Sequence, residues 1–146
     1  MGEERARAIT LGDIARLLAA KGDVDQALKL HQEKLAIVEA LGDPDSIAHT
    51  LWSVAQIELR QQHFEQAFEH LAVSYDINLK LGRLDAICSV GQDFGQLLCV
   101  AGDREKGLAV LERSRDDFVK LGRPENSSYV QSIINEISER AKKYAR

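Results

Sequence analysis

VEALGDP, residues 38–44, returns 40 residues later as NLKLGRL, residues 78–84, and again as FVKLGRP, residues 118–124. Each copy closes an apolar run with Leu-Gly, and a glycine in that place is a typical end of an α-helix. A fixed period between 20 and 50 residues is the signature of repeat proteins. The 146 residues therefore divide into three units of 40 residues and a remainder of about 26.

Each unit is predicted to contain two helices. In the first unit, apolar residues recur every three or four positions on both sides of the Gly22-Asp23 break. Asp23 and Asp103 are placed as N-caps, and Pro44 and Pro124 as first-turn prolines. No segment shows the alternation of a strand. We expect seven helices near residues 4–20, 24–40, 45–61, 64–80, 84–101, 104–120 and 125–144.

Small residues distinguish this pattern from other repeats of similar length. HEAT and armadillo arrays and propeller blades also have periods near 40 residues, but a propeller needs strands and signatures that are absent here. The small residues lie twelve positions apart, one near the middle of each helix of a pair, where the two backbones must approach closely. These pairs are Ala15 with Ala27, Ala55 with Ala67, and Gly95 with Gly107.

The chain resembles the tetratricopeptide repeat, whose pattern is W-x2-L-G-x2-Y…A-x3-F. Its first-helix positions hold Leu11, Ile14, Ala15 and Leu18; Leu51, Val54, Ala55 and Glu58; and Gly91, Phe94, Gly95 and Leu98. Its second-helix positions hold Ala27 and His31, Ala67 and Leu71, and Gly107 and Leu111. The departures at His31, Glu58 and Gly91 lead us to expect looser or edge-exposed contacts there. The period exceeds the usual 34 or so residues, as in the long-repeat branch of kinesin light chains and bacterial peptide-sensing regulators.

The resemblance, over residues 5–122, implies an all-α fold, a right-handed α-solenoid of antiparallel helix pairs. We expect a single domain over residues 1–146, with repeats at about 3–42, 43–82 and 83–122 and a capping helix at about 124–145. The apolar stripe of that cap is Val130, Ile133, Ile134, Ile137, Ala141 and Tyr144. The first repeat has no such cap. Its first helix is therefore exposed on one side, packs on a second copy in a homodimer, or belongs to a longer array.

Composition narrows the range of partners and compartments. The 19 basic and 23 acidic residues give a net charge of -4 without a basic run, which argues against nucleic acid. No window has the 18 to 20 apolar residues, roughly, of a membrane span, and the first residues mix both charges, unlike a signal peptide. Cys88 and Cys99 lie too far apart along one helix for a disulfide. We expect a cytoplasmic protein that does not act at a membrane.

No motif in the sequence predicts catalysis, a metal or a cofactor. The four histidines lack the spacing of a metal-binding motif, and no glycine-rich phosphate loop follows a strand. Neither cysteine precedes a helix start, where a thiol would be activated. The expectation is that the protein is not an enzyme and uses no cofactor.

The resemblance implies that the first helix of each pair lines a concave groove for a partner. Glutamine amides can hydrogen bond to a peptide backbone, and an aromatic ring supplies an anchor, so the groove suits a peptide or helix. Trp52 is predicted either to point into the groove or to fold over the core edge. The Lys and Asn clamp by which some family members hold a C-terminal carboxylate is not matched. The predicted groove residues are Arg16, His49, Trp52, Gln56, Gln92, Asp93 and Gln96.

These observations predict a non-catalytic protein–protein interaction module. Two alternatives stay open at this point. One is a sensor or regulatory fragment of a larger signalling protein, in which ligand binding changes the superhelix. The other is a structural unit that assembles with itself through its helix ends.

Overall fold

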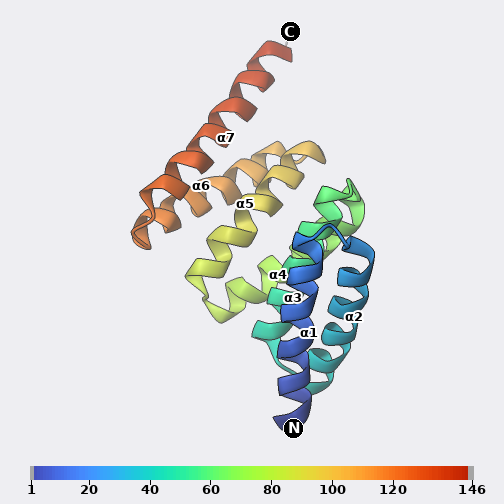
Figure 1. Cartoon of the computed structure of the whole chain (residues 1–146). Coiled ribbons are helices and arrows are strands. Elements are labelled where there is room, and N and C mark those ends of the chain that lie inside the picture. Colours follow the sequence, from blue (N-terminus) through green and yellow to red (C-terminus); the bar gives the residue numbers. More distant parts are fainter. Residues whose placement is uncertain (1, 145–146) are drawn as a thin grey trace. The chain divides into compact units, whose positions relative to one another are not determined.

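A computed structural model describes residues 2–144 of the chain, and all of its regular structure is helical (Figure 1). No strand occurs among these residues, so the all-α prediction is confirmed. Every helix begins and ends within two residues of its predicted position. Residue 145, the last of the predicted cap, lies outside the described part. The helices are α1 (Gly2–Ala20), α2 (Val24–Leu41), α3 (Pro44–Arg60), α4 (Phe64–Leu81), α5 (Leu84–Val100), α6 (Arg104–Lys120) and α7 (Pro124–Tyr144).

The repeated Leu-Gly turns end helices as predicted. Gly42 has φ 64°, a left-handed conformation that a glycine adopts without the steric cost of a side chain. Its N–H donates to the carbonyl of Glu39, and the next N–H, of Asp43, donates to that of Val38. These bonds satisfy carbonyls that the end of a helix leaves without partners. Gly82 and Gly122, in the two later copies of the turn, have φ 70° and 73°.

The helix starts differ from one another in their caps. The Asp103 side chain accepts a hydrogen bond from the Lys106 N–H at 3.3 Å, which confirms the predicted cap of α6. Asp23 is the N-cap residue of α2, as predicted, but its side chain makes no cap bond. A further cap lies at the start of α3. The Asp43 carboxylate accepts hydrogen bonds from the Ser46 N–H at 3.3 Å and from the Ser46 hydroxyl at 2.7 Å. Pro44 follows it at the first helical position, where no donor is lost.

The described residues form two compact units, unit 1 (Met1–Ile77) and unit 2 (Asn78–Arg146), and each is described by itself. The single domain expected over residues 1–146 therefore stays a prediction. In unit 1, α1 packs on α2, and α2 packs on α3. Its core includes two clusters of buried residues. One is built on Ala8, Ile37 and Val38, and the other on Ala15, Ala27 and Ile57.

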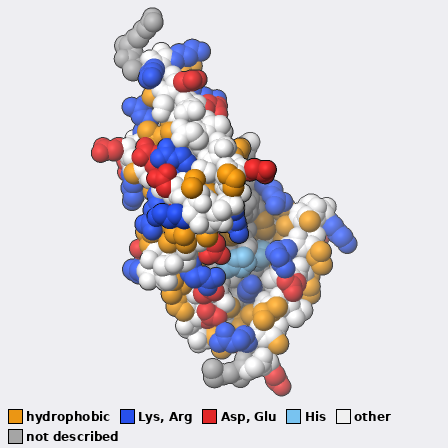
Figure 2. Space-filling model, turned by 90° about the vertical axis from the view of Figure 1, so that its left-hand side faces the viewer, with side chains coloured by type: hydrophobic (Ala, Val, Ile, Leu, Met, Phe, Trp, Pro, Cys, Tyr) orange, Lys and Arg blue, Asp and Glu red, His pale blue; other side chains and the backbone are white. Residues whose placement is uncertain are grey.

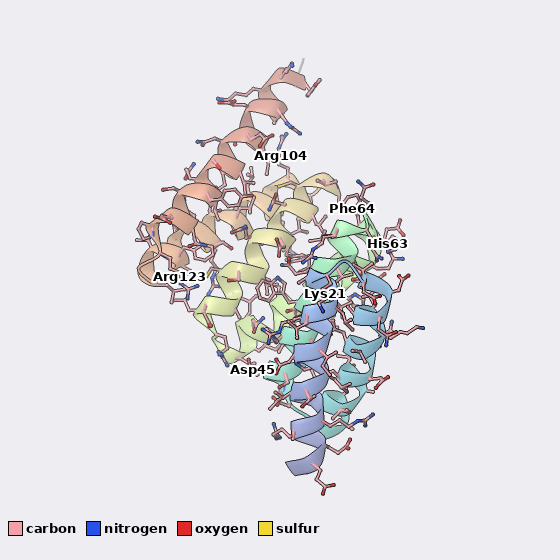
Figure 3. All side chains as sticks on the ribbon, in the orientation of Figure 1. Lys21, Asp45, His63, Phe64, Arg104 and Arg123 are labelled. Carbon is pink, nitrogen blue, oxygen red and sulfur yellow. The ribbon has the colours of Figure 1, made fainter. Side chains whose placement is uncertain are left out.

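Unit 2 has a core of its own between α5, α6 and α7. Leu111 and Phe118 of α6 contact Cys88 of α5 and Val130 and Ile134 of α7. Side chains fill the space between these helices in Figure 3, in which Arg104 marks the first residue of α6 and Arg123 the turn between α6 and α7. The stripe predicted for the last helix packs as expected up to Ile137. Tyr144 is the exception, because it lies at the end of α7 and is 77% exposed.

Close contact of paired helices rests on the predicted small residues. Ala15, Ala27, Ala55 and Ala67 are fully buried. In unit 2, a Cβ added to Gly107 would lie 2.7 Å from the Gly95 carbonyl oxygen and 2.5 Å from Cys99 Sγ. Such distances leave no room for a methyl group, so α5 and α6 meet backbone to backbone at this point.

Two polar departures from the repeat pattern are buried, contrary to expectation. Glu58 is only 7% exposed, and its carboxylate lies 2.7 Å from His70 Nδ1 on α4. His31 is only 3% exposed. Gly91 is also buried. The helix pairs enclose these positions whatever residue fills them, and the Glu58 carboxylate is accommodated because it has a partner.

The glycine contact gives a first stability prediction. Gly107→Ala should lower the free energy of unfolding by about 2 kcal/mol, because overpacking against backbone atoms outweighs the helix propensity that alanine adds. The matched control is Gly12→Ala in α1, where the new Cβ would meet only the flexible end of Lys34. Chemical denaturation of both variants measures the difference. Equal stabilities would contradict the close contact of α5 and α6.

The caps give a second prediction. Asp103→Ala should cost about 1 kcal/mol, since it removes the bond to the Lys106 N–H. Asp23→Ala is the control, because Asp23 stands before a helix without making that bond. Thermal unfolding followed by circular dichroism compares the two. If Asp23→Ala lost as much stability as Asp103→Ala, the missing cap bond could not be the cause of the loss in Asp103→Ala.

Candidate functional site

Four of the predicted groove residues come together in unit 1. Arg16 on α1 and His49, Trp52 and Gln56 on α3 line one cavity of about 350 Å³. Ala19, Ala20, His31, Ser53, Ile57 and Arg60 complete its lining. The lining is therefore mainly apolar and also carries cationic and amide groups. Clefts of this kind, apolar with a few convergent polar groups, are typical ligand sites.

Helix periodicity explains why these side chains share a side. Arg16 and Gln56 each follow the buried alanine of their helix by one position, so they stand at the edge of the packed face. His49 and Trp52 are three residues apart and lie on the same face of α3. Their rings are 6.2 Å apart at an interplanar angle of 64°, an edge-on contact. Of the two orientations open for Trp52, the structure has the one that lines the cavity.

A second, smaller cavity adjoins the first and is lined by three helices. It has a volume of about 150 Å³ and shares Arg16, His31, His49 and Ser53 with the larger one. Ile9, Gly12, Asp13 and Lys34 complete its lining. On the face shown in Figure 2, histidine atoms are exposed beside lysine and arginine atoms. The smaller cavity thus brings Lys34 and Asp13 beside Arg16, whereas the larger one adds Arg60.

His31 is buried in an environment that keeps it neutral. Burial lowers its pKa to about 4, and the positive charges of Lys34 and Arg16 add to the effect, as does the neighbouring His49. Within residues 2–144, its Nδ1 atom is buried and has no hydrogen-bond partner. A buried polar atom without a partner carries a free-energy cost that a bound ligand or water would relieve.

The other basic groups of the smaller cavity also have shifted pKa values. Burial lowers the pKa of Lys34, Asp13 opposes this shift, and Arg16 adds to it. Burial likewise lowers the pKa of His49, and Lys34 and Arg16 lower it further. Arg16 is paired with Asp13, whose carboxylate it contacts at 2.5 Å. The cavity is therefore a place where positive charge is crowded.

Lys34 and His31 line the smaller cavity together with Gly12, and neither is among the predicted groove residues. In the sequence, His31 stood out only as a departure from the aromatic residue of the repeat pattern. The available signal was that departure combined with Lys34 three residues later, since a separation of three places both on one helix face. The room for Lys34 comes from Gly12, because a Cβ at Gly12 would lie 2.7 Å from Lys34 Nζ. Such a contact between two helices is not visible in the sequence.

The remaining predicted groove residues lie in unit 2. Gln96 lines a cavity of about 570 Å³ with residues of α5 and α7, among them Cys99, Tyr129 and Ile133. Gln92 and Asp93 are half-buried on α5 and are not part of that lining. The Gln96 amide donates to the Gln92 carbonyl at 3.0 Å, so one of its two donors is used within the helix.

The described residues offer little reactive chemistry. Residues 2–144 contain no group of three or more His, Cys, Asp or Glu side chains that could hold a metal ion. Cys88 and Cys99 are free, and burial raises the pKa of both thiols, which disfavours the reactive thiolate. No helix in the same part has the length and apolar character required to cross a bilayer. The arrangement is suited to binding.

The pKa of His31 predicts acid-sensitive stability. Its folded pKa, about 4, lies below the unfolded value of 6.5, so the unfolded chain binds more protons between these values. Stability should be full above about pH 6.5 and fall by about 2 kcal/mol by about pH 5. His31→Phe should remove this part of the pH dependence, as measured by denaturation at the two pH values. If His31→Phe still lost about 2 kcal/mol of stability between the two pH values, the loss could not come from protonation of His31.

Three kinds of comparison relate the chain to known proteins. Residues 6–80, about half of the chain, match the tetratricopeptide repeat family. No curated protein sequence matches. Among solved structures, BtubC (BKLC) from P. vanneervenii aligns with 94% of this chain, at 15% identity and a TM-score of 0.65, and the chain spans 65% of that protein's length.

Two further structures have the same fold. The N-terminal domain of stress-induced protein-1 (STI-1) from C. elegans aligns with 88% of this chain and 95% of its own, at 15% identity and a TM-score of 0.65. A putative kinesin light chain from Podosopora anserina, with nearly identical TPR-like repeats, aligns over 93% and 76% at 14% identity and a TM-score of 0.62. The predicted resemblance is confirmed: the chain belongs to the tetratricopeptide repeat family.

Proposed function

We propose that the protein docks a segment of a partner protein in a groove lined by the first helices of its repeats. Tetratricopeptide repeats are in general protein–protein interaction modules and non-catalytic scaffolds. The finer proposal is that the partner lies against Arg16, His49, Trp52, Gln56, Gln92, Asp93 and Gln96, without catalysis and without a cofactor. It would do so in the cytoplasm, with neither nucleic acid nor a membrane as partner.

One observation carries this proposal, namely that Arg16, His49, Trp52 and Gln56 line the same cavity in unit 1. Tryptophan and arginine are the residues that most often dominate binding energy at protein interfaces. The half-buried Trp52 ring gives an apolar side chain of the partner a flat surface to cover. The Gln56 amide can serve as both donor and acceptor for a peptide backbone.

Unit 2 supports the same proposal through a cavity of its own. Gln96 lies at that cavity with Tyr129 and Ile133, which again combines an amide with an aromatic and an aliphatic side chain. Tyr129 is 57% exposed and accessible to a partner. Gln92 and Asp93, one turn or less away on α5, are proposed as rim contacts.

A second candidate function is self-assembly through α1. Ile14 and Leu17 are 43% and 64% exposed on this helix, although apolar residues at repeat positions normally pack on a neighbouring helix. A homodimer or a longer array would cover them. The sensor or regulatory fragment predicted as an alternative would instead use the groove for its ligand and another domain for its output.

The groove is tested by affinity capture with a triple variant. We expect a partner enriched from source cytoplasm by the parent protein to be lost, at least tenfold, with Trp52→Ala, Gln56→Ala and Gln96→Ala combined. Quantitative mass spectrometry of the captured proteins measures the loss. The control carries Gln32→Ala and Gln66→Ala, exposed glutamines of the second helices α2 and α4.

The outcomes separate the candidates. Loss with the groove variant and retention with the control would support docking in the groove. Equal recovery with all three proteins, each folded by circular dichroism, would contradict it. A mass near twice that of the chain by light scattering, reduced by Leu17→Glu, would favour self-assembly through α1.

A further inference from the structure

We propose that α1 pairs with α1 of a second copy of this chain, antiparallel to it and related to it by a two-fold axis. This pairing rests on the second candidate function, self-assembly through α1, and decides between the homodimer and the longer array. It does not involve the groove, because Ile14 and Leu17 of α1 line neither of the two cavities described in unit 1.

The exposed face of α1 corresponds to a face that α3 buries. At the 40-residue spacing of the repeat, Ile14 corresponds to Val54 of α3, and Leu17 corresponds to Ile57. Val54 and Ile57 are buried, and Ile57 packs with Ala27 of the second helix α2. Ile14 and Leu17 are exposed instead. α1 therefore carries the apolar residues of a helix interface without a helix of the described residues to cover them.

The two apolar residues belong to a stripe that runs the length of α1. Its members are all exposed and recur at alternating intervals of four and three residues, which places them on one side of the helix. The last member follows α1 directly, and its N–H still donates to the Leu17 carbonyl as in a helix. The stripe, charged toward its ends and apolar in between, consists of Glu3, Arg7, Thr10, Ile14, Leu17 and Lys21.

The charged ends of the stripe are complementary to each other. Glu3 lies in the first turn of α1, and Lys21, labelled in Figure 3, lies just after its last residue. Neither side chain makes an ion pair within residues 2–144, whereas Arg7 pairs with Glu4 at 3.9 Å and with Glu33 at 3.6 Å. In an antiparallel pair, each Glu3 meets Lys21 of the other copy. A parallel pair would bring like charges together.

The middle of the stripe is complementary to itself in the same arrangement. When Glu3 of one copy lies opposite Lys21 of the other, Thr10 lies opposite Ile14, and Arg7 lies opposite Leu17. The Arg7 stem offers apolar surface to Leu17 while its guanidinium group stays in water at the edge of the contact. A two-fold axis produces each of these contacts twice.

The face of α7 at which a further helix would pack is polar. Asn135 stands 40 residues after Gly95, the residue of α5 that packs on α6. Asn135 accepts a hydrogen bond from the Gln131 amide at 2.9 Å, and Gln131 accepts one from Arg115 of α6 at 2.8 Å. In an array, α1 of one copy would have to cover such a polar face of the next. The closed pair instead covers the apolar stripes of both copies with each other.

The oligomeric state is the first test of the pairing. Each copy contributes only two large apolar side chains, so we expect a weak dimer with a Kd between about 10 and 500 µM. Sedimentation equilibrium of the whole chain at low salt and about pH 7, from about 10 µM to 1 mM, measures this constant. The mass should rise toward twice that of the chain and not beyond it.

Reversal of the end charges tests the antiparallel orientation. Glu3→Lys and Lys21→Glu should each raise the Kd about tenfold, because each change places like charges opposite one another at both ends of the pair. The double variant restores opposite charges and should return the Kd to within about threefold of the parent value. The matched control, Lys29→Glu with Glu39→Lys, makes the same two changes at exposed positions of α2 and should leave the Kd unchanged.

Removal of the apolar residues tests the middle of the stripe. Ile14→Gln combined with Leu17→Gln should leave the chain monomeric at about 1 mM, without lowering the melting temperature, because both side chains are exposed in the monomer. The control is Val119→Gln, at an exposed apolar residue of α6, which should dimerise like the parent. Circular dichroism establishes that each variant is folded.

The outcomes that overturn the pairing are distinct from one another. A parent chain that stays monomeric up to about 1 mM would overturn the pairing together with self-assembly through α1. A mass beyond two chains would overturn the closed pair in favour of an array. A dimer that responds equally to the α1 and α2 charge reversals would overturn the antiparallel contact. Groove docking is unaffected by each of these results, because capture with the groove variant measures it separately.

Discussion

The close approach of paired helices is the constraint on which the rest of the structure depends. Where α5 crosses α6, Gly107 leaves no room for even a methyl group against the Gly95 carbonyl. In unit 1, the fully buried Ala15 and Ala27 play the corresponding part between α1 and α2. This contact fixes which face of each helix is buried, and so it also fixes which residues are left to line the cavities.

The close packing of paired helices also buries polar residues that stand at core positions of the repeat. A helix pair buries its inner positions regardless of their chemistry, because backbone geometry determines the enclosure. Glu58 is accommodated there by His70, at 2.7 Å. The Nδ1 atom of His31 has no such partner within residues 2–144, and burial and nearby cations keep the ring neutral by lowering its pKa to about 4. A departure from the repeat pattern thus converts a core position into the wall of a basic cavity.

The two adjoining cavities of unit 1 differ in their chemical character. The larger offers Trp52, a flat apolar surface, with Gln56 beside it, and the smaller offers crowded positive charge around Lys34. Apolar contact contributes most of the affinity at protein interfaces, whereas a placed charge contributes selectivity between partners. The chain has a net charge of -4, but the positive charge around Lys34 is local and acts on any group that lies in the smaller cavity.

The sequence by itself determined the helices, their order and their closest contacts. The 40-residue period, the Leu-Gly turns and the small residues twelve apart are local signals, and each depends on backbone rules that act within one helix or one turn. The shared side of Arg16, His49, Trp52 and Gln56 was likewise predictable, because it follows from helical periodicity in α1 and α3.

Only the tertiary structure decided what lies between helices. That Glu58 and His31 are buried, and that Lys34 passes over Gly12, depends on side chains from separate helices. The sequence records which residues these are but not the distances between them. Those distances follow from how the helices pack, and for this reason the cavity around Lys34 became visible only in the folded chain.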